Sequence, residues 1–305
     1  MSFSELFNTF ANNLLPILLV GLAGYILGKS LSVDSRTLGR VVFYVFSPLL
    51  VFNLMVKSEL DLQQALTTVG FTAVVIFIMG SLAFIFGKLL QLERPHLLAV
   101  ILTVAFGNTG NYGLPLVKFA FGDEALAVAS LFYVTTTILF NTVGVVIASL
   151  GHTDLKSALW GLLKLPSLYG VALALLVKSS GLQLALPLSR TIEIAASGAI
   201  PVMLLLLGLE LTRIQWSHSF RALGLGVLVK LFIGPVVGLS LAALFGLQGH
   251  ARQASVIEAA MPAAVATTVV ATEYQLEPAL VTAIVFLGTI LSPLTLTPLL
   301  VYLAR

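Results

Sequence analysis

The residues best suited to bind a ligand lie together in the stretch Gly107–Pro115, which reads Gly-Asn-Thr-Gly-Asn-Tyr-Gly-Leu-Pro. Glycine and proline disfavour a continuous helix, while asparagine amides both donate and accept hydrogen bonds. Apolar runs, Leu97–Phe106 and Leu116–Phe121, flank the stretch. A helix broken within a bilayer persists only where it packs against protein or lines a cavity, because lipid cannot satisfy its backbone. Broken helices build substrate sites in transporters, so this stretch predicts such a site.

A second interrupted segment, Ala251–Thr272, supplies the other half of the predicted site. Its Pro262 removes a backbone donor and falls at the position that matches Asn108 when the two halves of the chain are aligned. Two such segments crossing near the membrane centre would present helix N-termini, whose free N–H groups and positive dipole ends favour an anion. The side chains expected beside that anion are those of Asn108, Asn111, Thr267 and Thr268, with Tyr112 as a further candidate and Pro115 opening the second half-helix.

Composition places the chain in a membrane. Of its 305 residues, 58% are hydrophobic and 10% are charged, whereas soluble domains carry about 25% charged residues. The absence of cysteine excludes disulfides and thiolate metal sites. The four histidines are scattered, and no catalytic or metal-ligand spacing is present, so we expect no enzyme activity, metal or other cofactor. A net charge of +3 is too small to indicate nucleic-acid binding.

Ten apolar segments follow one another, most of them near the roughly 20 residues that span a bilayer. They lie at Asn13–Gly28, Thr37–Val56, Leu66–Leu90, His96–Phe121 (broken), Ala125–Leu150, Leu155–Val177, Ile192–Leu211, Phe220–Phe245, Ala251–Thr272 (broken) and Ala279–Leu303. The sequence therefore predicts an all-α protein with ten transmembrane helices.

Basic residues in the connections set the expected orientation. One side has nine, namely Lys29, Arg36, Arg40, Lys88, Arg94, Lys156, Lys164, Arg213 and Arg221, and the other has five, namely Lys57, Lys178, Arg190, Arg252 and Arg305. The richer side is expected in the cytoplasm. This predicts a multi-pass protein of the inner or plasma membrane with both termini outside the cytoplasm.

The two halves of the chain resemble each other at a nearly constant offset. Pro48 precedes Pro201 by 153 residues, and the two broken segments fall into register on an offset of 154. Five spans in each half is an odd number, so the second copy must be inverted in the membrane. We therefore expect two inverted five-helix repeats, residues 1–154 and 155–305, whose broken fourth and ninth helices cross.

Four ionisable residues fall within apolar segments, where an unpaired charge is costly. For Glu210, an interfacial pair with Arg213 is the simplest interpretation. Lys230 and Glu258 form either a structural charge pair or a proton-linked switch. Lys118 either adds positive potential beside the crossover or extends its amine to the interface.

Several stretches of the sequence resemble the auxin efflux carrier family, which includes plant carriers and bacterial permeases. The resemblance covers essentially the whole chain and is carried by Asn108–Lys118, Glu258–Pro262, Ser47–Leu50, Gly208–Leu211 and Gly234-Pro235. A connection of only Gly151–Asp154 and a glycine at 107, where plant members have a long loop and a proline, favour the bacterial type.

The resemblance implies a scaffold of helices 1, 2, 6 and 7 and a mobile transport domain of helices 3–5 and 8–10. It implies an elevator-type movement, a homodimer, Asn108 as a central ligand, and scaffold contacts around Pro48 and Pro201. The expected substrates are small organic anions, carboxylates such as malate or malonate rather than auxin-like acids. The alternatives are a sodium- or proton-coupled symporter or antiporter of the same fold and a membrane anion sensor that does not transport.

Overall fold

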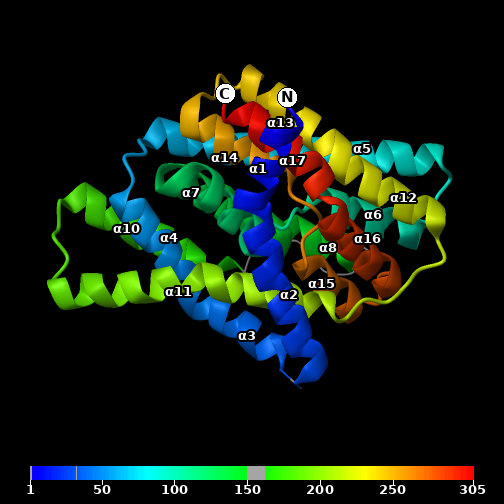
Figure 1. Cartoon of the computed structure of the whole chain (residues 1–305), viewed down its shortest axis with the longest axis horizontal. Helices are drawn as coiled ribbons and strands as arrows, with labels where there is room; N and C mark the ends of the chain where they lie inside the picture. The colour runs from blue at the N-terminus through cyan, green and yellow to red at the C-terminus, as the bar shows by residue number, and fades with distance from the viewer. Residues whose placement is uncertain (1, 32, 150–161) are drawn as a thin grey trace.

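The computed structural model describes residues 2–31, 33–149 and 162–305, and these residues form helices and connections without a strand (Figure 1). Several helices include a π-helical turn, labelled η. The elements before residue 150 are α1 (Phe3–Thr9), η1 (Phe10–Leu14), α2 (Leu15–Ser30), α3 (Ser35–Val41), η2 (Val42–Phe46), α4 (Ser47–Lys57), α5 (Leu62–Leu89), α6 (Arg94–Ala105), η3 (Thr109–Gly113), α7 (Leu114–Leu139), η4 (Phe140–Gly144) and α8 (Val145–Ala148).

The elements after residue 161 follow a similar order, with a long helix pair first and an interrupted segment later. They are α10 (Pro166–Ser180), α11 (Leu186–Leu211), α12 (Phe220–Leu228), η5 (Val229–Ile233), α13 (Gly234–Leu244), α14 (Gly249–Ala260), α15 (Ala266–Glu273), α16 (Pro278–Leu291) and α17 (Pro293–Leu303).

Six helical runs of the described chain are long and apolar enough to cross a membrane, or seven if the pair α16–α17, bent by 48°, counts as one span. The predicted all-helical membrane protein is thus confirmed. The arrangement of ten spans as inverted repeats stays a prediction, because α6 and α10 are too short to be counted as membrane spans by length alone. The start of the predicted segment Leu155–Val177 lies outside the described residues.

One of these runs, Thr109–Ala148, contains 40 residues and is divided by a single glycine. Gly122 has a φ of 80° and a ψ of −163° within α7, a conformation that glycine adopts without steric cost. The chain therefore changes direction between Phe121 and Ala125, where the sequence predicts the end of one segment and the start of the next.

The helices form two groups that pack mainly within themselves. In one group α2 packs on α11, and α4 packs on both α10 and α11; in the other α5, α6, α7, α13 and α14 pack together. Contact between α2 and α11 depends on glycine: a Cβ at Gly208 would lie 1.7 Å from the Gly21 carbonyl oxygen, and one at Gly24 would lie 2.1 Å from that of Leu205. Small residues allow such close backbone approach between membrane helices.

The two prolines expected to shape the scaffold helices occupy different local settings. Pro48 follows the π-helical turn η2 in the first turn of α4, and its carbonyl oxygen would lie 2.6 Å from a Cβ at Gly170 of α10. Pro201 is exposed within α11, which continues as one helix through it. Both residues therefore belong to the helix group of α2, α4, α10 and α11.

The chain ends lie close together at one end of the molecule (Figure 1). The Arg305 guanidinium lies 3.2 Å from the Glu5 carboxylate, and α1 packs on α17. Both residues are about half exposed, so this ion pair adds little stability. The pair shows only that the described ends of the chain lie side by side at this end of the molecule.

We predict that Gly208→Ala lowers the unfolding temperature in detergent, because its Cβ would overlap the backbone of α2. Overpacking of this kind costs about 1–3 kcal/mol. The matched control is Gly224→Ala in α12, where an added Cβ meets nothing within 4 Å. Equal unfolding temperatures for Gly208→Ala and wild type would show that α2 and α11 do not approach this closely.

Candidate functional site

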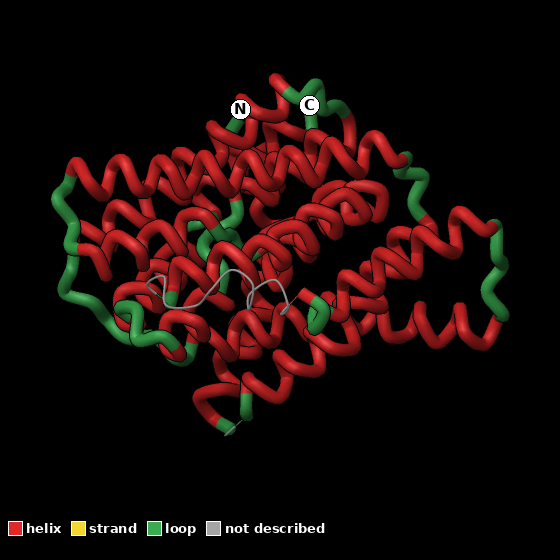
Figure 2. The backbone as a smooth tube through the Cα atoms, turned by 180° about the vertical axis from the view of Figure 1, so that it is seen from behind, coloured by secondary structure: helices red, strands yellow, loops and turns green. Residues whose placement is uncertain are grey.

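The two predicted breaks meet inside the molecule and are hydrogen-bonded to each other. Gly107 and Ala263 form an antiparallel bridge. The Asn108 N–H donates to the Pro262 carbonyl at 2.7 Å, and the Ala264 N–H donates to the Phe106 carbonyl at 2.9 Å. Figure 2 shows this non-helical chain enclosed by helices, unlike the peripheral loops. The bridge thus satisfies backbone groups that the breaks release from their helices.

Each break turns directly into a new helix. The Asn108 carbonyl accepts the Gly113 N–H at 2.9 Å as the chain enters η3. Pro115 stands in the first turn of α7 but does not open the new helix, because the helical run already begins at Thr109. After the second break, the Thr267 and Thr268 hydroxyls donate to the Ala264 and Val265 carbonyls, at 2.6 and 2.8 Å. Both threonine hydroxyl hydrogens are therefore used locally.

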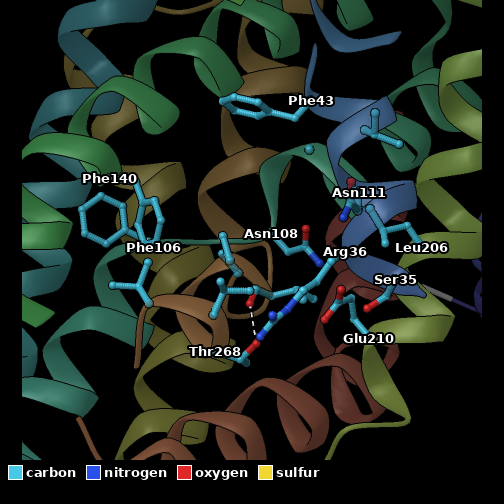
Figure 3. A pocket seen from close by; sticks show the side chains of 18 of the residues that line it. Ser35, Arg36, Phe43, Phe106, Asn108, Asn111, Phe140, Leu206, Glu210 and Thr268 are labelled. Carbon is cyan, nitrogen blue, oxygen red and sulfur yellow. Dashed lines mark hydrogen bonds between the residues drawn. The ribbon is translucent and has the colours of Figure 1, made fainter. Parts of the chain in front are cut away.

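A cavity of about 1130 Å³ reaches the bridged breaks (Figure 3). Asn108 and Asn111 from the first break line it, and Thr268 of α15 lines it from the second. Its exposed lining residues include Arg36, in the first turn of α3, and Arg213, just after α11. The cavity thus opens towards the end of the molecule that carries the α2–α3 and α11–α12 connections.

Three buried polar atoms among its lining residues have no hydrogen-bond partner within the described part of the chain. They are Asn108 Nδ2, Ser35 Oγ and Thr136 Oγ1, in residues that are 4%, 2% and 5% exposed. They come from three separate segments: the first break, α3 and α7. Unpaired buried polar groups are costly, so their convergence on one cavity indicates a place for a polar ligand.

Charged side chains line the outer part of the cavity, namely Arg36, Arg40, Arg213, Glu210 and Glu273. Arg213 lies 3.8 Å from Asp34, so the predicted pair of Arg213 with Glu210 is not the ion pair that forms. Hydrogen bonds from the Thr37 hydroxyl and the backbone N–H groups of Arg36 and Thr37 lower the pKa of Asp34 below its usual value. Asp34 is therefore ionised near neutral pH and offsets Arg213.

The two remaining arginines have no such partner. Within the described chain, no carboxylate oxygen lies within 4.0 Å of Arg36 or Arg40. They are four positions apart on α3, so they lie on similar faces of the helix. The cavity wall formed by α3 is therefore positively charged.

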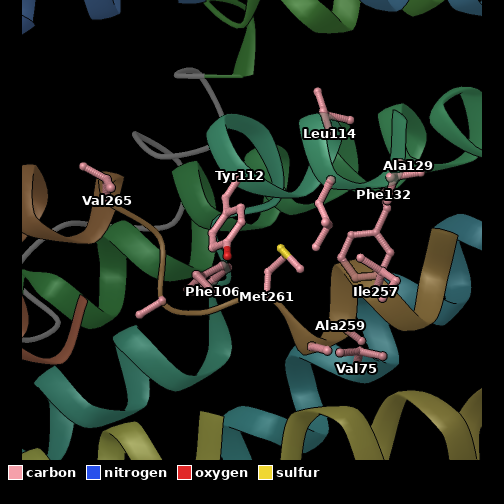
Figure 4. Packing of buried hydrophobic residues seen from close by; sticks show 14 of the residues in the cluster. Val75, Phe106, Tyr112, Leu114, Ala129, Phe132, Ile257, Ala259, Met261 and Val265 are labelled. Carbon is pink, nitrogen blue, oxygen red and sulfur yellow. The ribbon is translucent and has the colours of Figure 1, made fainter. Parts of the chain in front are cut away.

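Of the nine residues predicted to bind substrate, the cavity brings together Asn108, Asn111 and Thr268. The other six are absent from its lining: Tyr112, Pro115, Pro262, Thr267, Pro48 and Pro201. Tyr112 is fully buried, with its hydroxyl 3.0 Å from Ser292 Oγ, and it packs beside Phe106 and Met261 (Figure 4). Pro262 contributes through its carbonyl, which receives the Asn108 N–H.

The predicted charge pair of Lys230 with Glu258 does not form as a direct contact. Both side chains are buried, but neither Glu258 oxygen has a hydrogen-bond partner among the described residues, and no ion pair joins the two. They lie beside different glycines instead. A Cβ at Gly113 would lie 2.2 Å from Glu258 Oε2, and one at Gly107 would lie 3.2 Å from Lys230 Nζ.

Lys118 lies away from the cavity. Its amine pairs with Asp123 across the Gly122 bend, and both side chains are partly exposed. It therefore adds no positive charge to the cavity wall. Sequence reasoning missed Ser35 and Thr136 and treated Arg36 only as a topological charge. The one feature of the sequence that could have indicated this wall was the spacing of Arg36 and Arg40, which are four positions apart.

Comparison with known proteins agrees with this architecture. The family described as membrane transport protein matches residues 9–300. Uncharacterized transporters of Methanothermobacter thermautotrophicus and Methanocaldococcus jannaschii are 27% and 29% identical, each over 92% of this chain and 94% of its relative. A Rhizobium meliloti protein named "Putative malonate transporter" is 28% identical over 92% of both chains.

The match extends over both helix groups, both interrupted segments and the cavity between them. Together with several apolar helices of membrane-spanning length, it leads to one conclusion. The chain belongs to the membrane transport protein family, the auxin efflux carrier family that its sequence resembles, and is a multi-pass membrane transporter.

Proposed function

We propose that this transporter carries small organic anions, carboxylates such as malate or malonate, and binds them where the two helix breaks meet. The observation that carries the proposal is the buried Asn108 amide, which lines the cavity with its Nδ2 unpaired. A carboxylate oxygen is a suitable acceptor for that donor, and α15 begins beside it at Ala266. The arginine-bearing wall of α3 adds the opposite charge that an anion needs.

The relatives support this substrate class only at the level of their names. One relative of 28% identity has malonate in its name, and the two archaeal relatives have no substrate in theirs. A cavity of about 1130 Å³ is ample for a small carboxylate with its water. The size and shape of the cavity therefore contribute less to substrate selection than the few charged and polar groups on its walls.

We further propose that residues 1–154 and 155–305 are inverted repeats of five helices, with the interrupted fourth and ninth helices crossing at the bridge. The similar order of elements in the two halves supports this. The group of α2, α4, α10 and α11 would be the scaffold and the base of a homodimer. The group that contains both breaks would move past it in an elevator-type cycle, which fits the separate packing of the two groups.

The proposed orientation keeps both termini outside the cytoplasm. The cavity opens on the side of the α2–α3 and α11–α12 connections, and these belong to the side richer in basic residues. In this orientation the site faces the cytoplasm. Small anions would then bind or leave on the inner side in this conformation.

A coupled symporter or antiporter is the second candidate, and Glu258 is the observation that favours it. Its carboxylate is buried behind the first break, against Gly113, with both oxygens unpaired. A proton or a sodium ion would satisfy such a group. A sensor that binds the anion without moving it is the third candidate, and an uptake assay in proteoliposomes separates it from both carriers.

We predict that Asn108→Ala sharply weakens carboxylate binding without unfolding the protein. Losing a hydrogen bond to a charged ligand costs about 1.5–3 kcal/mol, or roughly 10- to 150-fold in affinity. Titration calorimetry of purified protein measures the change. The control is Asn13→Ala, whose amide bonds to the Thr9 carbonyl outside the cavity. Unchanged affinity in Asn108→Ala would remove Asn108 from the site.

We predict that a cysteine at His218 is protected from an impermeant thiol reagent applied to intact cells, while one at Leu182 is labelled. Both positions are exposed, in the α11–α12 and α10–α11 connections. The chain has no cysteine of its own, so background labelling is absent. The reverse pattern would invert the proposed orientation.

We predict that Glu258→Gln flattens the pH or sodium dependence of uptake if this carboxylate couples transport to an ion. Glutamine keeps the shape of the side chain but cannot ionise. The control is Glu59→Gln in the α4–α5 connection, outside the cavity. A profile identical to wild type, with only a lower unfolding temperature, would assign Glu258 a structural role.

A further inference from the structure

We infer that Ser35 and Arg36, at the start of α3, bind a second carboxylate, so that the site selects dicarboxylates over monocarboxylates. The inference rests on the proposed function, because it takes Asn108 as the anchor of the first carboxylate. It assigns a role to two residues of α3, which packs on α11 of the opposite helix group. It also turns a general anion site into one that distinguishes ligands with two charges.

Arg36 has the position and the freedom for this role. Figure 3 shows its side chain extending from α3 into the cavity in the direction of Asn108 and Thr268. No carboxylate among the described residues lies within 4.0 Å of its guanidinium. An arginine that lines a ligand-sized cavity without a carboxylate partner in the described chain is suited to bidentate binding of a carboxylate.

Ser35 supplies the second donor. The residue is 2% exposed and lines the cavity, yet its Oγ has no hydrogen-bond partner. Asp34 already accepts the backbone N–H groups of Arg36 and Thr37, at 3.1 and 3.2 Å. The start of α3 is thus fixed by its own cap, while the adjacent hydroxyl and guanidinium remain available to a ligand.

Acidic residues beside and inside the cavity leave this site available. Asp34, which is not part of the lining, lies 3.8 Å from Arg213, so those two charges offset each other. Glu210 and Glu273 line the cavity and disfavour an anion near them, but within the described chain neither makes an ion pair with Arg36.

The test compares each dicarboxylate with its own mono-amide, which has the same size and one charge fewer. Malonate and malate are titrated against malonamate and malamate by calorimetry, on the full-length protein in detergent. The variants are Arg36→Gln, Ser35→Ala and Asn108→Ala. The control is Lys57→Gln, because Lys57 pairs with Glu193 away from the cavity. Each variant must elute as one species and keep the unfolding temperature of wild type.

Wild type should bind at least one dicarboxylate about tenfold or more tightly than its mono-amide, and Arg36→Gln should remove that preference while leaving mono-amide affinity nearly unchanged. Ser35→Ala should reduce the preference less, and Asn108→Ala should weaken both ligands. Equal loss of both ligands in Arg36→Gln, no loss, or the same loss of preference in Lys57→Gln would overturn the assignment. Mono-amide binding that depends on Asn108, with no preference for two charges, would reject only this inference. Wild type binding none of the ligands would reject the proposed function itself.

Discussion

The backbone pairing between the two helix breaks is the interaction on which the site depends. Two interrupted segments release N–H and C=O groups deep inside an apolar protein, where each unpaired group would cost several kcal/mol. The bridge between Gly107 and Ala263, with its flanking hydrogen bonds to Pro262 and Phe106, satisfies them mutually. Neither break is stable alone, so both must form together. The new helix starts and the position of Asn108 at the end of the cavity follow from that pairing.

The glycines beside the bridge explain how charged groups are accommodated so close to it. Gly113 leaves room for the Glu258 carboxylate, and Gly107 leaves room for the Lys230 amine, at positions where a Cβ would lie 2.2 and 3.2 Å away. These two side chains pack on different glycines of the same break and do not pair directly. The break therefore has ionisable groups on its buried side and the Asn108 amide on its cavity side. A change in the charge of Glu258 would act directly on the first break, because this carboxylate packs against Gly113.

The presence of two breaks and their meeting were predictable from the sequence, and the partners of individual side chains were not. Glycine and proline in Gly107–Pro115 indicate the first break, but the structure confines its non-helical part to Phe106–Asn108, because Thr109–Gly113 forms the π-helical turn η3. The role of Tyr112 could not be seen, because its hydroxyl meets Ser292, 180 residues away. A charge pair of Lys230 with Glu258 was one expectation, because both residues lie within apolar segments. Position along a segment does not give the direction of a side chain, and only the packed structure separates them.

The same reasoning explains why the charged wall of the cavity escaped sequence analysis. Arg36 and Arg40 occupy a helix start rich in polar residues, where basic side chains ordinarily face water and report only topology. What makes them different is that α3 packs on α11 and borders a cavity that extends to Asn108. A ligand touching both Arg36 and Asn108 would contact both helix groups at once. In an open, hydrated cavity such charges act weakly, and they strengthen as water leaves, because Coulomb interactions grow when the local dielectric falls. If the two helix groups move relative to each other, a ligand can contact Arg36 and Asn108 together only while α3 lies close to the bridge. Binding of the second carboxylate would then stabilise only that arrangement. Selection and movement would then depend on the same contact.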